Sequence, residues 1–531
     1  MTRKLVVNRA RTLFTICVML TVPAGAQNTA SPAASGVTLL DAVRYTLEHH
    51  PLIGEQKAQV TSNRGLTLQA SGQFDTLLQS GLSQSHLNNP ISSFDAAQLG
   101  IPVGTSQVSN LTNLTFSAGK LFRNGIKISP SLALNRDSSY SVNPVLNTSQ
   151  LGFVVTVPLL RGLGRSAVDA PEIAAATEVD ASLLDLNQLM AQLMANTVSS
   201  YWNLVASRKL VDIAREAEHR GEVYVDNVKA LIDADHVPRS DLDEVAANLA
   251  DRSANRIAAD QQVVIARQQL ALDMGTSAYD LFTVLDPTDD FPPGEDQTLP
   301  ADTSGALQSC LNQALQHRAD YLAAKRRIDK ARVLRVAAKN ALLPQLNLSF
   351  ESGYTRLDEG RALGHFFASP AAGNGGPDAT VGVSYSFPPA NSEARGQVMQ
   401  ADAFAQQNEL QAVQVARNIS TSVVTALEGV RNAILRVKKA RESVESFRLS
   451  LDGQRERYRV GMSPVVDVLT VEDRLNNALG SQVQAQLSYA LALIQFRLAT
   501  GTIIAPDQPA QTVRPQTFST LPFDTDAGVC R

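Results

Sequence analysis

Cysteine and aromatic residues are scarce in this chain. Its 531 residues include three cysteines and one tryptophan, and aromatic side chains make up 5% of the sequence. Cys17 lies in the apolar N-terminal segment, which leaves Cys310 and Cys530 for the rest of the chain. Two cysteines make no disulfide framework, although this pair could form one bridge in an oxidising compartment.

Residue patterns that carry chemistry are also missing. None of the seven histidines has metal-ligand spacing to a cysteine or a carboxylate, so we predict no metal site. The sequence contains no Ser/His/Asp constellation, no phosphate-binding loop and no dinucleotide fingerprint. We therefore expect neither an enzyme nor a cofactor.

The first 26 residues are typical of a secretory signal. A basic start is followed by the short apolar run Leu13–Val22 and the small-residue cleavage site Ala24–Ala26. Removing this segment changes the formal net charge from −4 to −8, which argues against a nucleic-acid partner. No apolar run of about 20 residues follows, so an exported chain of this kind is secreted, periplasmic or a membrane β-barrel.

The second half of the chain repeats the first. Asp235–Leu242 matches Gly461–Val468 at an offset of 226 positions, and Gly275 matches Gly501 at the same offset. Earlier matched positions are 268 apart, so the first half contains about 42 extra residues. An alternating segment among them, Ile126–Leu134, predicts an added hairpin or an elongated strand. A duplicated long-helix hairpin favours an elongated, assembly-forming protein.

Each half predicts the order helix, strands, very long helix, turn and return helix. Alternation with a period of two residues marks the strands. The long helices, near 167–234 and 393–460, would each measure about 100 Å at 1.5 Å per residue. Valines recur every seven residues from Val423 to Val444, which indicates a coiled-coil seam.

The predicted boundaries follow from these patterns. They are a signal peptide over 1–26, a first repeat over 27–275, a linker over 276–306, a second repeat over 307–501 and an irregular tail over 502–531.

The strands suggest how such a chain could enter a membrane. We expect four amphipathic strands of about ten residues per chain, which is long enough to cross a bilayer but too few to close a barrel. Since membrane strands cannot leave open edges, three chains would share a barrel of about twelve strands. In each strand pair, one strand would cross the membrane and the next would cross back. All helices would therefore lie on the side from which the chain enters, which is the periplasm for an exported chain. The predicted fold class is therefore α+β membrane, with a trimeric barrel continuing into a long helical coiled-coil tunnel.

The chain resembles the TolC-like outer-membrane efflux protein family from about Leu39 to Gly501. The most specific parts are RYRVGMSPVVDVL at Arg457–Leu469 and VPLLRGLG at Val157–Gly164. The resemblance implies a homotrimer in outer-membrane lipid, with a periplasmic adaptor (membrane fusion) protein and an inner-membrane transporter as partners. It implies the exit channel of a tripartite efflux or type I secretion system, a passive conduit for small molecules or polypeptides.

The resemblance also implies a gate at the helical turns, where the family's tunnel closes. An acidic residue follows each turn in the family, and a tyrosine precedes the second. The matching gate residues are Asp241, Tyr458 and Asp467, and the turn residues are Pro238, Gly461 and Pro464.

Three copies of Asp467 around one axis would favour cations, and Asp241 could share a hydrogen bond with Tyr458. Ser463 departs from the family, because the best-known members carry a tip-locking arginine there, and Thr470 replaces a second ring aspartate. Alternatively, both aspartates are only first-turn residues favoured by the helix dipole.

A second class of function also fits part of the pattern. An exported structural coiled-coil protein or adhesin would need the long helices but conduct nothing. Such a protein would not need amphipathic strand pairs, yet both repeats have them before the long helix. The strands therefore distinguish the two hypotheses.

Overall fold

The computed structural model describes residues 36–138, 145–235, 237–277, 286–294, 303–504, 515–523 and 530. The predicted signal peptide and parts of the predicted linker and tail lie outside these residues. Within the described ranges, no helix combines the length and the apolar character that a membrane-spanning helix needs.

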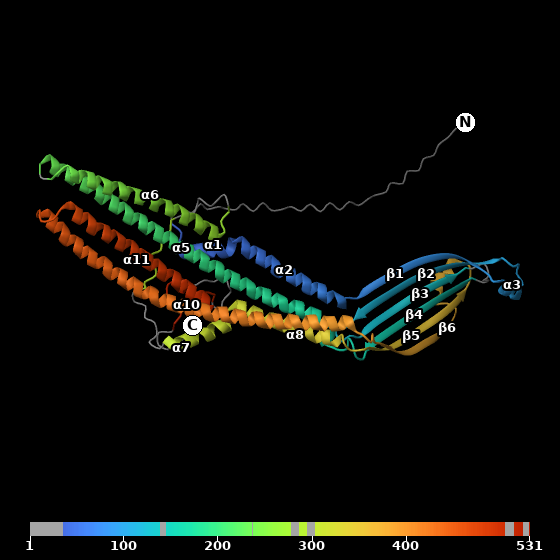
Figure 1. Cartoon of the computed structure of the whole chain (residues 1–531). Helices are drawn as coiled ribbons and strands as arrows, with labels where there is room; N and C mark the ends of the chain where they lie inside the picture. The colour runs from blue at the N-terminus through green and yellow to red at the C-terminus, as the bar shows by residue number, and fades with distance from the viewer. Residues whose placement is uncertain are drawn as a thin grey trace, which may run out of the picture. The chain divides into compact units, whose positions relative to one another are not determined.

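The two repeats have the same order of long elements, as predicted (Figure 1). In each repeat two helices lead to strands, and a very long helix then turns into a shorter return helix. The long helices of the two repeats contain 64 and 68 residues, so each is about 100 Å long. The helices of the first repeat are α1 (Leu39–His49), α2 (Pro51–Ser71), α5 (Ala170–Asp233) and α6 (Ser240–Met274). Those of the second are α7 (Thr303–His317), α8 (Ala319–Asn340), α10 (Ser392–Arg459) and α11 (Val465–Thr500).

Short helical pieces occupy the connections between these elements. They are η1 (Gly72–Phe74), α3 (Ser93–Leu99), α4 (Arg165–Val168), α9 (Leu363–Ala368) and η2 (Pro515–Phe518).

The helix ends follow the local sequence. Gly275 and Gly501 have φ values of 73° and 72°, the left-handed conformation in which glycine ends a helix without strain. At the hairpin turns, Asp235 and Gly461 are also left-handed, with φ values of 53° and 75°. The repeated turn signature therefore reflects one backbone conformation used twice.

Within the described residues, the strands form one antiparallel sheet of six in sequence order (Figure 1). They are β1 (Leu77–Pro90), β2 (Ser106–Leu121), β3 (Lys127–Asp137), β4 (Leu146–Pro158), β5 (Gln345–Glu359) and β6 (Asn374–Ser386). The predicted number of four strands per chain is wrong. The added hairpin is β2–β3, which accounts for the extra residues of the first repeat.

The missed strand is β2, and its composition explains why. On its apolar side, only Leu114 and Phe116 are large, while Asn110 and Thr112 are polar. An alternation carried by two residues is too weak to predict a strand. The turn after β2 closes with Phe122 N–H donating to the Ile126 carbonyl at 2.8 Å.

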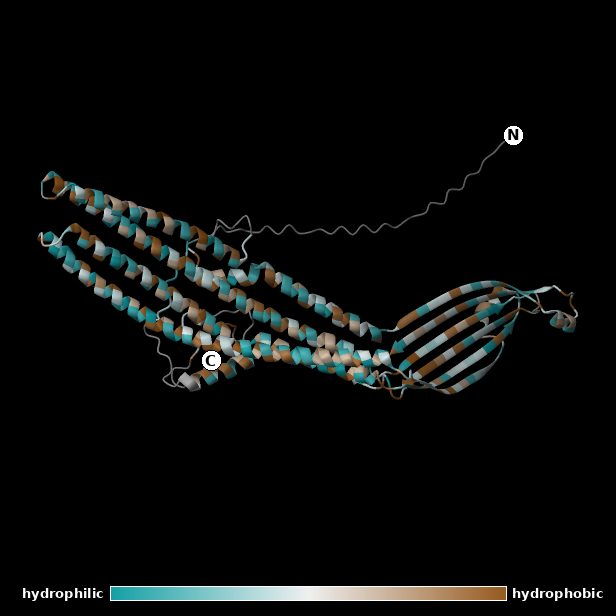
Figure 2. Ribbon diagram, in the orientation of Figure 1, coloured by the Kyte–Doolittle hydropathy of each residue, from teal (hydrophilic) through white to brown (hydrophobic). Residues whose placement is uncertain are grey.

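The two faces of the sheet differ in polarity, as the alternating colours of the strands in Figure 2 show. Cross-strand pairing places apolar side chains of all six strands on one face, which we call the apolar face. Its members include Leu82, Phe116, Leu132, Leu151, Phe153, Phe350, Tyr354, Val381, Val383 and Tyr385. The opposite face carries serine, threonine, asparagine, glutamine and glycine at most positions.

The core lies among the helices. Val423, Val430, Val437 and Val444 are buried, which confirms the predicted seam of α10, and α10 packs along α11. A second core lies where α5, α6, α11 and α1 meet.

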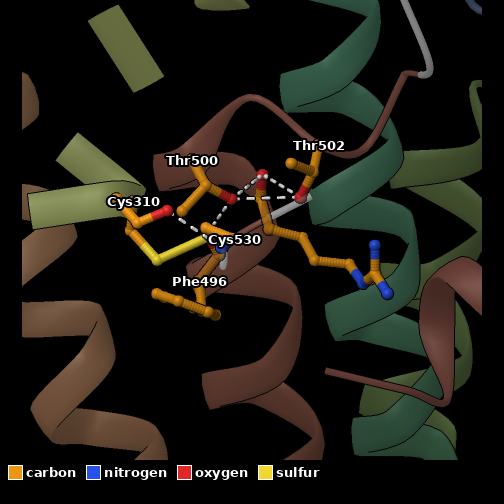
Figure 3. Close-up of a disulfide and its surroundings, with 7 residues drawn as sticks. Cys310, Phe496, Thr500, Thr502 and Cys530 are labelled. Atoms are coloured by element: carbon orange, nitrogen blue, oxygen red, sulfur yellow. Dashed lines mark hydrogen bonds between the residues drawn. A yellow bond between two sulfur atoms is a disulfide. The ribbon is translucent and has the colours of Figure 1, made fainter. Parts of the chain in front are cut away.

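The two cysteines outside the N-terminal segment are paired (Figure 3). Cys310 of α7 and Cys530 of the tail form a buried disulfide with 5.0 Å between their Cα atoms. The Cys530 N–H also donates to Ser309 Oγ at 3.1 Å. The tail is thereby attached to the helices of the second repeat.

Candidate functional site

The turns of the two helical hairpins line an open cavity of about 1000 Å³. Four of the predicted residues line it: Asp241, Tyr458, Gly461 and Pro464. Residues of α5, Asn227 and Leu231 among them, form another wall. The predicted residues Pro238 and Asp467 are described in the structure but do not line the cavity. The sequence repeat thus identified two turns that meet in space.

Tyr458 lies half-buried near the end of α10, against apolar side chains from both hairpins. Burial raises the pKa of its phenol, and nearby Tyr224 and Asp241 raise it further. The phenol is therefore a neutral donor at physiological pH. Among the described residues, however, no hydrogen bond joins Tyr458 to Asp241, so the bond expected between them is not formed here.

Asp467 lies exposed in the first turn of α11. Ser463 Oγ donates to its Oδ2 at 3.1 Å, and Gln454 Nε2 of α10 donates to the same Ser463 Oγ at 2.5 Å. Ser463, which replaces the arginine implied by the family resemblance, therefore links α10 to this aspartate through hydrogen bonds from uncharged donors. The position suits either a pore residue or a helix-start residue.

A buried charged cluster lies further along α11 and was not predicted from the sequence. Glu472 is fully buried, and three arginines from three other helices surround it. Arg220 of α5 donates its Nε–H to Oε1 of Glu472. Arg252 of α6 lies 3.4 Å from Oε2, and Arg455 of α10 lies 3.8 Å from Oε1. The two hairpins are joined through one carboxylate.

Neighbouring polar groups complete this cluster. Arg252 also contacts Asp473 at 3.0 Å and donates to the Ala217 carbonyl at 3.0 Å. Arg220 donates to Asn476 Oδ1 at 2.8 Å and lies 3.7 Å from Glu216. The three guanidinium charges are thus matched by three carboxylates, as buried charges require.

The charged cluster can join the helices, and the cavity at the turns can present charged side chains. Within the described residues, no group of three or more histidine, cysteine, aspartate or glutamate side chains could hold a metal ion. Glu472 is enclosed by its arginines, so it is not presented to a substrate. The cavity at the turns is the feature through which this end of the helices could respond to a ligand, an ion or a partner.

Known proteins match the chain in sequence and in fold. Residues 310–502 match the family model described as outer membrane efflux protein. No curated protein sequence matches the chain. The OprN outer-membrane channel is 19% identical with a TM-score of 0.63, over 89% of this chain and 91% of that chain. The CmeC outer membrane channel of Campylobacter jejuni is 15% identical with a TM-score of 0.63, over 89% and 87%. CusC, a transmembrane channel, is 14% identical with a TM-score of 0.64, over 89% and 95%.

These matches confirm the predicted resemblance and the α+β fold class. The family model covers the second repeat, including the turn at Gly461 and Pro464, while the solved channels share the fold of nearly the whole chain. OprN and CmeC are outer-membrane channels. Residues 310–502 are therefore similar in sequence to the outer membrane efflux protein family, and the chain shares its fold with solved outer-membrane channels.

Proposed function

We propose that three copies of this chain form an outer-membrane exit channel, a passive conduit driven by an inner-membrane transporter. The main support for the proposal is the amphipathic sheet, whose two edge strands are unpaired on their outer sides in the part of the chain that the structure describes. One face is apolar and the other polar, and β1 and β6 each have one partner strand among the described residues. In lipid, such edges must be paired, and symmetric copies of the same chain can pair them.

The strand number sets the size of the proposed barrel. The six strands among the described residues of each chain give about eighteen in a trimer, within the range of known membrane barrels. The apolar face would contact lipid and the polar face would line the pore. Because all strands of one chain are joined in sequence order, the subunit boundaries fall between β6 of one copy and β1 of the next.

The first prediction concerns assembly. Protein extracted from the outer membrane should have the native mass of three chains. Phe350→Lys should strongly reduce the trimer, because a lysine near the middle of a lipid-facing strand costs about 2–4 kcal/mol. Native mass spectrometry and outer-membrane fractionation measure both results.

Glu351→Lys is the matched control. Glu351 is the next residue of β5 and lies on the polar face, so a lysine there stays in water and the trimer should form. A soluble monomer, or equal loss of trimer in both variants, would contradict the proposed membrane orientation. The alternative, an exported coiled-coil protein or adhesin, predicts a soluble chain in which neither substitution matters.

The gate is the second part of the proposal. We infer that Asp467, Asp241 and Tyr458 act at the periplasmic tip, where the two hairpin turns meet. Three Asp467 carboxylates around the axis would attract cations into the narrowest part of the pore. Tyr458, neutral at physiological pH, would hold the closed arrangement by packing between the hairpins.

The second prediction tests this gate by single-channel recording. Asp467→Asn should lower cation selectivity and weaken block by multivalent cations, because three negative charges leave one constriction. Tyr458→Ala should raise the basal conductance, whereas Tyr458→Phe should leave it near wild type, since no Tyr458–Asp241 bond is present. Unchanged selectivity in Asp467→Asn would leave that aspartate as a first-turn residue of α11 that the helix dipole favours.

The proposed partners follow from the same location. A periplasmic adaptor would contact the exposed helix surfaces near the tip, and an inner-membrane transporter would supply the energy. The substrate class, small molecules or polypeptides, would be selected by that transporter.

A further inference from the structure

The loop between β5 and β6 folds back onto the sheet. Its short helix α9 packs against β3, β4 and β5, at the end of the sheet away from the long helices. The other loop helix at this end, α3, has no comparable packing partner among the described elements. The α9 helix therefore occupies a defined place on one face of the sheet.

The register identifies the face that α9 covers. Arg136, Asn147 and Asp358 are cross-strand neighbours beneath this loop. Asp358 is separated from Tyr354 and Phe350 by even numbers of residues, so all three point to the same side of β5. This is the apolar face. The α9 helix thus lies on the outside of the proposed barrel, not within its pore.

Polar contacts fix the loop in this position. Arg136 Nη2 donates to the Arg361 carbonyl at 2.6 Å, and Asn147 Nδ2 donates to the Gly360 carbonyl at 3.0 Å. His365 Nδ1 lies 2.8 Å from Asp358 Oδ2. A Cβ on Gly360 would approach the His365 ring to 2.4 Å, so only glycine permits this close contact.

The outward side of α9 is apolar. Phe366 is buried against the strands, whereas Leu363 and Phe367 are 66% and 63% exposed. These two residues are four positions apart, so they lie on the same side of the helix. Phe367 meets the Phe366 ring edge-on, with ring centroids 5.1 Å apart, yet both Leu363 and Phe367 keep most of their surface exposed.

The position of α9 matches the edge of a lipid bilayer. On β5, the apolar face runs from Leu346 to Tyr354, a length of about 26 Å along the strand at 3.3 Å per residue. At the usual strand tilt of about 35–45° this length spans about 19–22 Å of height, most of the apolar band of about 25 Å in membrane barrels. Tyr354 stands at its far end, as expected for an interfacial aromatic residue. The α9 helix lies just beyond it. Subunit contacts would use β1 and β6, so they leave the outer side of β3–β5 to lipid.

We propose that α9 is a membrane-interface helix that inserts Leu363 and Phe367 into the outer leaflet of the outer membrane. The proposal rests on the membrane barrel described above. A helix fixed to the sheet and anchored in the interface sets the height of the barrel in the bilayer, because displacement either way moves these side chains out of their layer.

Tryptophan fluorescence in vesicles tests this proposal. Trimers of Phe367→Trp, and separately of Leu363→Trp, are reconstituted into phosphatidylcholine with acyl chains brominated near the carbonyl or near the chain middle. Bromine near the carbonyl should quench both tryptophans most strongly, and aqueous iodide should quench them weakly. The native Trp202 is buried among the helices and supplies the baseline in the unsubstituted protein.

Two further variants separate the possible outcomes. Phe350→Trp, in the middle of the apolar face, should be quenched best by deep bromine, and Phe94→Trp on α3 should be quenched by iodide alone. Lipid quenching of Phe350→Trp with only iodide quenching of Phe367→Trp and Leu363→Trp would overturn the role of α9 but keep the barrel. Absence of lipid quenching in all four variants would overturn the membrane barrel itself.

Discussion

Replacing Glu472 with alanine should destabilise the joined helical hairpins by about 3–5 kcal/mol, the cost of breaking a buried ion pair. Arg252 is buried and would lose the fully buried carboxylate of Glu472, keeping Asp473 and the Ala217 carbonyl. Arg220 would keep Asn476 and Glu216. The effect should be local to the part of α5, α6, α10 and α11 around the cluster. Hydrogen exchange of backbone amides there, followed by mass spectrometry, measures the change in opening free energy.

Two variants make this test specific. Glu472→Gln keeps the shape of the side chain and two acceptor sites, so it should destabilise less than alanine. Glu442→Ala removes an exposed carboxylate of α10 that pairs with Lys439 at 2.7 Å, and it should leave exchange unchanged. Equal exchange in wild type and Glu472→Ala would show that the cluster contributes little and that apolar packing alone joins the hairpins.

The long elements could be predicted because their signals are local and repeated. Val423 to Val444 recur at the period of a coiled coil, and Gly461 occurs where the chain must turn. Each signal depends on nearby residues, and the turn that contains Gly461 has a counterpart at Asp235 in the first half, so neither signal needs knowledge of the partner helix. The alternation of Ile126–Leu134 and the difference between the offsets predicted an added hairpin or an elongated strand, and the structure contains the hairpin.

The charged cluster and α9 could not be predicted, for a different reason. Arg220 and Glu472 are 252 positions apart, and nothing near either residue shows which charges will face each other. Likewise, the sequence around Leu363 is too short for a helical period to be recognised. Both features depend on pairing between distant elements, which only the folded chain reveals. The strand β2 was missed because its apolar alternation is weak.

Loss of the Cys310–Cys530 disulfide should also destabilise the protein strongly. The bridge closes 220 positions of sequence, and removing a native disulfide costs about 2–5 kcal/mol. The tail would then depend on its remaining contacts. Phe523 packs against Phe496 with the rings tilted by 31° and their centroids 5.5 Å apart, and Arg497 donates to the Thr520 carbonyl at 2.6 Å. Burial lowers the pKa of Arg497 to about 10, so its guanidinium stays charged at neutral pH.

The test is limited proteolysis of the double variant Cys310→Ala/Cys530→Ala. Cleavage within 515–523 should be faster than in the wild type, and amides of α7 should exchange faster, because the tail no longer covers that helix. A reductant should produce the same change in the wild type and none in the variant. If cleavage of the double variant matches that of the oxidised wild type, the contacts of Phe523 and Thr520 hold the tail without the bridge. In that case Arg497→Ala, which removes the donor to Thr520, should release the tail even with the disulfide intact.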